Sequence, residues 1–243
     1  RAEGLGEREV EHDRPVLGGE LDGEAGDAQA ALQLFRTVRY GQAMEVLPGV
    51  ELVFRDAGHI LGSASVWLRL REGDLERKLV FSGDVGQFDT PILCDPETGP
   101  AADLVLMEST YGDRRHRDRD ATRTEFGSIL RAARDDGGNV LIPAFAVGRS
   151  QEILYELATH FEAWGLADWQ IFLDSPMAIE ATEVYWKHAN LFDEEAQAWH
   201  ARARSLPPLP NLKLSRTADE SMAINKIRAG AIGFVMRSAG TEQ

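Results

Sequence analysis

Three acid or imidazole side chains each directly follow a short apolar run, and their chemistry suits a metal centre. They are His59 in DAGHILGSA, Asp84 in VFSGDVG and Glu108 in LMESTYGDR. Zinc accepts neutral imidazole nitrogen and carboxylate oxygen, and one carboxylate can bridge two ions. The spacing of the three residues fits no local metal motif. The residues alone therefore leave open both a metal site and a set of ordinary Gly-His and Gly-Asp turns.

The apolar runs before these residues predict strands, because they are short, rich in β-branched and aliphatic residues, and separated by Gly, Asp and Pro. Strand ends hold side chains rigidly, while the loop that follows leaves them open to a ligand. The predicted strands in this part of the chain cover residues 50–55, 64–70, 78–81 and 104–107.

Further along the chain, helical and strand patterns alternate, which is typical of β-α units. Helices are predicted over residues 27–35, 122–134, 150–164, 177–188 and 221–226, and strands over 140–145, 170–173 and 231–235, with a proline-rich linker at 207–210. The pattern predicts an α/β protein with two joined units, residues 1–123 and 124–243.

Composition and charge narrow the classes of protein that fit. The 43% hydrophobic content is ordinary for a chain that buries a core. The net charge of −14 argues against nonspecific nucleic-acid binding over the whole surface, but it permits a local basic groove. The arginines at 114, 115, 117 and 119 crowd one stretch, and the aspartates at 113, 118 and 120 offset them, so we interpret this run as a solvated loop.

The sequence also bears on location. No run is long and apolar enough for a membrane span, and the N-terminal stretch has no apolar segment of the signal-peptide kind. The single Cys94 excludes an intrachain disulfide, which suits a reducing cytosol. We therefore expect a cytoplasmic protein with no membrane partner, and its oligomeric state, including a homodimer, stays open.

Five sequence motifs occur in one order along the chain: DAGHILGSA, VFSGDVG, ESTYGDR, IPAFAVGRSQE and DSPMA. Together they resemble the metallo-β-lactamase and β-CASP family of RNA-processing nucleases, over roughly residues 28–240. The resemblance implies a partial metallo-β-lactamase αββα sandwich over residues 1–123. It also implies a β-CASP domain over residues 124–243, with a mostly parallel sheet and flanking helices.

The resemblance also implies roles for the three residues and a reaction. His59 would be a zinc ligand, Asp84 would bridge two Zn²⁺ ions, and Glu108 would orient a histidine and assist proton transfer. Zinc would activate water for attack on phosphorus, so the implied reaction is hydrolysis of single-stranded RNA by a metal-dependent hydrolase. Endonucleolytic and exonucleolytic cleavage both remain open.

Two further residues are candidates for binding RNA phosphate, and each has a structural alternative. Arg149 lies at the N-terminus of the helix predicted from residue 150, where free backbone N–H groups favour anions. It also fits the role of a helix cap. Ser175 matches the β-CASP signature, but Ser followed by Pro176 is also an ordinary helix N-cap.

The family's His-x-His-x-Asp-His motif is absent from the sequence, and its later histidine motifs would lie beyond Gln243. We therefore expect an internal piece of the enzyme that, alone, binds zinc weakly and cleaves nothing. Two other functions stay open: a noncatalytic β-CASP subunit that binds RNA or acts as a scaffold, and a metallo-hydrolase of small esters or thioesters.

Overall fold

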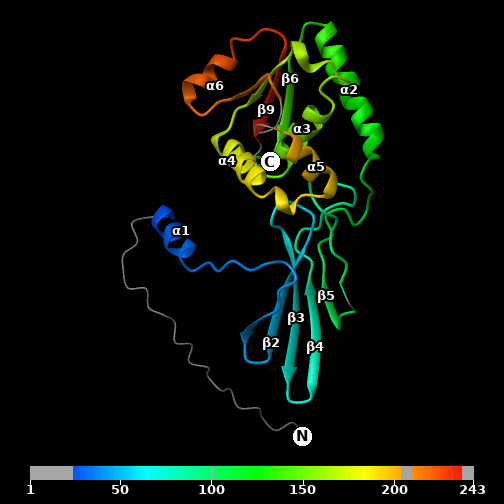
Figure 1. Ribbon diagram of the computed structural model, residues 1–243, viewed down its shortest axis with the longest axis vertical. Coiled ribbons are helices and arrows are strands. Elements are labelled where there is room, and N and C mark those ends of the chain that lie inside the picture. Colours follow the sequence, from blue (N-terminus) through cyan, green and yellow to red (C-terminus); the bar gives the residue numbers. More distant parts are fainter. Residues whose placement is uncertain (1–23, 100, 204–208, 237–243) are drawn as a thin grey trace. The chain divides into compact units, whose positions relative to one another are not determined.

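The computed structural model describes residues 24–99, 101–203 and 209–236 (Figure 1). The chain divides into two compact units, Arg1–Val38 and Arg39–Gln243. Within its described residues, the first unit contains helix α1 (Glu24–Leu32), close to the helix predicted over 27–35. The second unit contains both sheets and all the candidate site residues. This division does not fall at the domain boundary that we predict near residue 123, and that boundary stays a prediction. Arg123 lies inside helix α2 (Arg119–Asp135).

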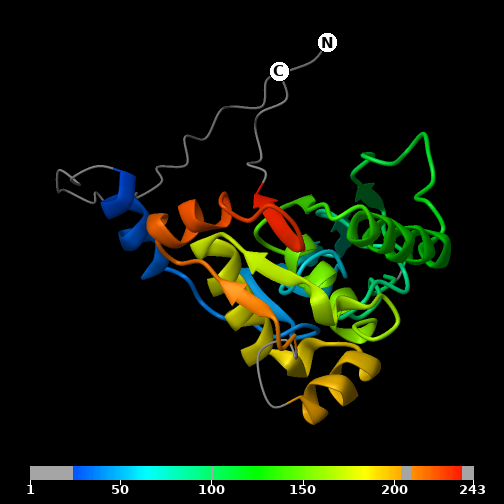
Figure 2. The ribbon, with the colours of Figure 1, turned by 90° about the horizontal axis from the view of Figure 1, so that it is seen from above.

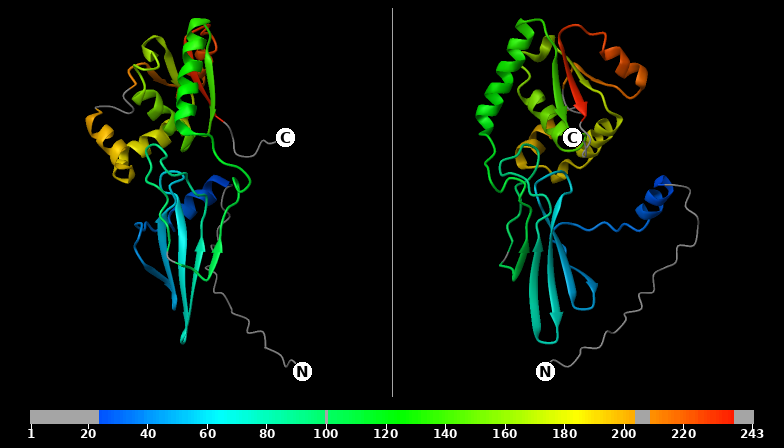
Figure 3. Two further views of the ribbon diagram at one scale, coloured as in Figure 1. Left: turned by 90° about the vertical axis from the view of Figure 1, so that its right-hand side faces the viewer. Right: turned by 180° about the vertical axis from the view of Figure 1, so that it is seen from behind.

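The first sheet has five strands in the order β1-β2-β3-β4-β5, which can be followed in Figure 3. The strands are β1 (Met44–Leu47), β2 (Val50–Asp56), β3 (Ala64–Glu72), β4 (Leu75–Phe81) and β5 (Leu104–Leu106). The first four pair antiparallel, and β5 pairs parallel with β4. The four strands predicted from the sequence are confirmed, and β1 is additional. The loops after β2, β4 and β5 carry His59, Asp84 and Glu108.

The second sheet is parallel throughout, in the order β6-β9-β7-β8. Its strands are β6 (Val140–Ala144), β7 (Gln170–Leu173), β8 (Leu212–Leu214) and β9 (Ala231–Met236). Three of them match the predicted strands, and the mixed α/β class is confirmed. Strand β8 is absent from the prediction.

Helices surround the second sheet (Figure 2). They are α2 (Arg119–Asp135), α3 (Arg149–Thr159), α4 (Pro176–Lys187), α5 (Glu194–Arg202) and α6 (Ala218–Ile224), with short 3-10 turns η1 (Leu166–Asp168) and η2 (Ala189–Leu191). Leu130 of α2 and Leu154 and Leu157 of α3 are fully buried against the sheet residues Ile171 and Ile232. This apolar core fixes α2 and α3, the two helices that contribute to the site. No helix in the part of the chain that the structure describes is long and apolar enough to cross a membrane.

A buried glutamine closes the loop that leads into α3. Gln151 is 4% exposed. Its Oε1 accepts from the Gly148 N–H at 2.7 Å, and its Nε2 donates to the Ala146 carbonyl at 3.1 Å and to Thr182 Oγ1 at 2.9 Å. One side chain therefore holds the loop 145–149 and joins α3 to α4.

Replacing Gln151 with leucine is expected to lower the free energy of unfolding by about 3 kcal/mol, because several buried polar groups lose their partners. Urea unfolding followed by circular dichroism measures this loss. The matched control is Gln42→Leu at an exposed position, which is expected to change stability by less than about 0.5 kcal/mol. Equal effects of the two substitutions would contradict the role assigned to Gln151.

Candidate metal and nucleic-acid site

The loop between β2 and β3 presents His59. Asp56 Oδ1 accepts from the Gly58 N–H at 2.8 Å, and Ser63 Oγ accepts from the N–H groups of His59 and Ile60 at 3.1 and 3.2 Å. Gly58 has a φ of +61°, a conformation that favours glycine. The loop's own side chains thus satisfy its backbone, and the His59 ring is left 44% exposed.

The loop after β4 brings Asp84 against the His59 loop. The Gly86 N–H donates to the Ala57 carbonyl at 2.8 Å. A Cβ at Gly86 would lie 1.8 Å from the Gly58 carbonyl oxygen, so only glycine permits this approach. As a result, His59 Nε2 and Asp84 Oδ2 are 3.8 Å apart.

Glu108 holds the Asp84 loop from the end of β5. Its Oε1 accepts from the Val85 N–H at 2.6 Å, and its Oε2 accepts from the Thr110 hydroxyl at 2.6 Å. The hydrogen bond from Thr110, then that from Val85, and the nearby His59 lower the pKa of the Glu108 carboxyl. Both carboxylate oxygens therefore accept hydrogen bonds, and Glu108 holds the backbone of Val85 beside Asp84. The proton-transfer role expected of Glu108 stays a prediction.

The three residues predicted from the sequence do converge, since His59, Asp84 and Glu108 all line one cleft of about 810 Å³. Two ligands of one tetrahedral zinc ion lie about 3.4 Å apart when each bond is about 2.1 Å. The 3.8 Å between His59 Nε2 and Asp84 Oδ2 is close to this spacing, and Asp84 is 77% exposed. These two donors fit a metal ion. Among the described residues, however, no group of three His, Cys, Asp or Glu side chains is arranged to hold one, so a third protein ligand is not found there.

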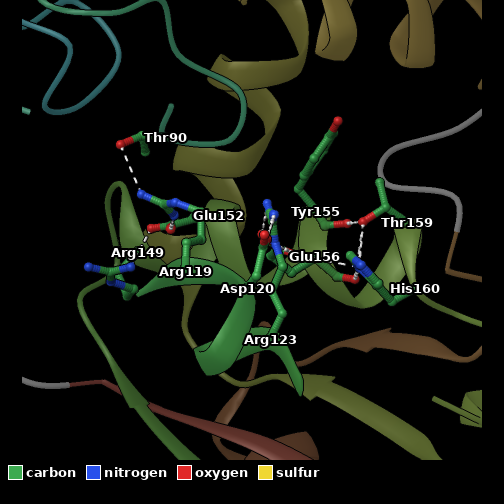
Figure 4. Close-up of polar contacts among 10 residues, drawn as sticks. All are labelled: Thr90, Arg119, Asp120, Arg123, Arg149, Glu152, Tyr155, Glu156, Thr159 and His160. Atoms are coloured by element: carbon green, nitrogen blue, oxygen red, sulfur yellow. Dashed lines mark hydrogen bonds and ion pairs between the residues drawn. The ribbon is translucent and has the colours of Figure 1, made fainter. Parts of the chain in front are cut away.

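Basic and acidic side chains from α2 and α3 line the same cleft (Figure 4). Glu152 accepts from Arg119 Nη1 at 3.1 Å and also from Arg149. Arg119 Nη2 also donates to Thr90 Oγ1 at 3.3 Å, in the segment that follows Asp84. The Glu152 carboxylate thus orients the guanidinium groups of Arg119 and Arg149. The hydrogen bond to Thr90 also connects Arg119 to the segment that follows Asp84.

A second pair repeats this arrangement one helical turn further on. Arg123 Nε donates to Glu156 Oε1 at 2.9 Å, and Glu156 also lies 3.3 Å from His160 Nδ1 (Figure 4). The hydrogen bond to Glu156 raises the pKa of Arg123. The two ion pairs fix α2 against α3, so the arginine-bearing wall of the cleft is held in place by its own carboxylates.

Comparison with known proteins identifies the family to which this chain belongs. The Beta-Casp domain family matches residues 150–240. Ribonuclease TTHA0252 of Thermus thermophilus is 40% identical over 214 residues, which cover 88% of this chain and 47% of that protein. The chain belongs to the β-CASP family. The resemblance that the five ordered motifs suggest is thereby confirmed.

Other relatives agree with the assignment. An RNase J-like protein of Methanocaldococcus jannaschii is 30% identical over 204 residues, covering 82% of this chain and 46% of that protein. Endoribonuclease YSH1 of Yarrowia lipolytica is 32% identical over 170 residues, covering 69% of this chain and 20% of that protein. The chain spans about half the length of the first two relatives.

The structure places the two predicted phosphate-binding residues differently. Arg149 begins α3, but Gly148 is the N-cap of that helix, and the Arg149 side chain lines the cleft. Its geometry is therefore that of a cleft residue rather than of a cap. Ser175 caps α4, because its Oγ accepts from the Ala178 N–H at 3.2 Å and Pro176 is the first residue of the helix. Ser175 is not among the described residues that line the cleft, so its binding role stays a prediction.

Sequence reasoning missed two residues that line the cleft, Arg119 and Glu152. We interpreted Arg119 as part of a solvated loop, but it is the first residue of α2 and its side chain pairs with Glu152. The error arose because local charge balance does not show which acid an arginine meets across the fold. The signal that was available is the helical spacing of Arg149 and Glu152, which puts both on one face of α3.

Proposed function

We propose that the protein containing this chain hydrolyses phosphodiester bonds of single-stranded RNA and uses zinc to do so. The observation that carries the proposal is the convergence of His59, Asp84 and Glu108 at one cleft that arginines also line. The ribonuclease names of the relatives support the choice of RNA. Because this chain has a net charge of −14, it needs such a local basic surface to hold a polyanion.

His59 and Asp84 would hold the metal, together with donors outside the described residues. Bound zinc supplies Lewis acidity that polarises a phosphoryl oxygen and favours deprotonation of water at neutral pH. Glu108 keeps the Asp84 loop in place through the Val85 N–H. Arg119 and Arg149 each retain guanidinium donors beyond those that Glu152 accepts, and these donors suit phosphate oxygens.

The test uses protein expressed from the complete reading frame, loaded with zinc or stripped by a chelator. End-labelled single-stranded RNA, duplex RNA and a thioester are the substrates. We expect zinc-dependent cleavage of single-stranded RNA and its loss in His59→Ala. RNA binding without cleavage would favour the scaffold function, and turnover of the thioester alone would favour the small-molecule hydrolase. Either result overturns the proposal.

A separate prediction concerns the 243-residue chain itself. The described residues supply two donors, which are fewer than the three or four that stable zinc sites use. We therefore expect this chain alone to bind zinc weakly and to cleave no RNA. Titration with a chromophoric zinc chelator as competitor measures the affinity. Tight stoichiometric binding that is lost in His59→Ala would show that the chain supplies a complete site.

A further inference from the structure

The loop between β5 and α2 carries a stack of three side chains beside the cleft. The ring centroids of Tyr111 and His116 are 3.7 Å apart with their planes tilted by 31°. The Arg114 guanidinium lies over the Tyr111 ring, 4.9 Å from its centroid.

The stack is adjacent to the reactive groups. Tyr111 and His116 line the cleft that Glu108, His59 and Asp84 also line. Only Ser109 and Thr110 separate Tyr111 from Glu108, and the Gly112 N–H donates to the Ser109 carbonyl at 3.0 Å to form a tight turn. The loop that supports the Asp84 segment through Glu108 thus also carries the rings.

Packing of the core does not explain the stack. Tyr111 is 48% exposed and His116 is also exposed. Neither belongs to either cluster of buried apolar residues, which are built from other side chains. Ordered rings that bury little apolar surface contribute little to folding, whereas exposed aromatic, imidazole and guanidinium planes are the surfaces on which unpaired bases stack.

We propose that Tyr111 and His116 form a base-stacking platform that takes an unpaired nucleobase of the RNA next to the phosphate at the metal site. This inference rests on the proposed RNA substrate. Arg115 and Arg117, which flank His116 and line the same cleft, supply phosphate donors beside the base. A base within a duplex already stacks on its neighbours, so the platform selects single strands.

The test compares two ligands that share a phosphate backbone. Fluorescence anisotropy measures binding of a labelled single-stranded RNA, and of an abasic oligomer of the same length, to chelator-treated protein from the complete reading frame. Stacking of one base on an aromatic ring contributes about 1 to 3 kcal/mol. We therefore expect Tyr111→Ala and His116→Ala each to weaken binding of the RNA about 5- to 150-fold. Binding of the abasic oligomer should stay unchanged.

Two further variants separate stacking from structural damage. Tyr111→Phe keeps the ring and is expected to restore RNA binding. Phe88→Ala removes an aromatic ring that is 61% exposed but is not among the cleft-lining residues, and it is expected to leave both affinities unchanged.

The possible failures are distinguishable. Equal weakening of both ligands in Tyr111→Ala, or equal binding of both ligands to the unaltered protein, overturns the platform but leaves RNA binding standing. Binding of neither ligand to the unaltered protein overturns the proposed function itself.

Discussion

Substitution of Asp84 by asparagine is expected to lower kcat/KM for RNA cleavage at least about 1000-fold, a loss of about 4 kcal/mol of transition-state stabilisation. The amide keeps the shape of the side chain but removes the anionic charge that a zinc ion requires of this ligand. The side chain is 77% exposed and its charged contact in the structure is with His59, so the fold should be retained. Steady-state cleavage assays and zinc analysis of the purified protein measure the two effects.

The matched control for this substitution is Asp113→Asn, which removes a carboxylate from the exposed loop after Glu108. Asp113 is not among the described residues that line the cleft. The control is expected to retain cleavage within about twofold, since surface substitutions away from a site have small effects. If Asp84→Asn retained both zinc and activity, Asp84 would not be a ligand.

Substitution of Gly86 by alanine is expected to weaken zinc binding by about 100-fold, although Gly86 carries no ligand atom. Its added Cβ would lie 1.8 Å from the Gly58 carbonyl oxygen and 2.2 Å from the Gly58 carbonyl carbon. Backbone atoms cannot move aside as a flexible side chain can, so the Asp84 and His59 loops must separate. The ligands would then no longer reach a common ion. Isothermal titration with zinc measures the change in affinity.

Gly138→Ala provides the control for Gly86→Ala. A Cβ there would lie 3.5 Å from the Ala133 carbonyl oxygen, which is an ordinary contact. Thermal unfolding of both variants separates a local change from loss of the fold. A folded Gly86→Ala variant with the same zinc affinity as the unaltered protein would contradict the role assigned to Gly86.

The strands that present the site were predictable because their signal is local. Each strand before His59, Asp84 and Glu108 contains a short stretch of β-branched and aliphatic residues and ends at a loop that contains glycine or serine. Strand β8 was missed because its three residues, Leu212–Leu214, carry little pattern of their own and are held by parallel pairing with β7. Helix α5 was missed although Asp193 before two glutamates is a recognisable helix start.

The contacts between loops could not be predicted from the residues in the same way. Nothing in the order of the residues shows that the Gly86 N–H donates to the Ala57 carbonyl beside His59. Likewise, the choice of Glu152 as the partner of both Arg119 and Arg149 depends on the packing of α2 against α3. Residue type and order therefore indicated which groups meet at the cleft, while the partners of each group followed from the tertiary structure.

The most direct test of the central claim, that His59 and Asp84 bind a common metal ion, is anomalous diffraction at the zinc edge from crystals of the zinc-loaded protein. We predict an anomalous peak about 2.0 to 2.2 Å from both His59 Nε2 and an Asp84 carboxylate oxygen. A fully occupied zinc ion elsewhere, with His59 and Asp84 still in direct contact and bound to no metal, would contradict it.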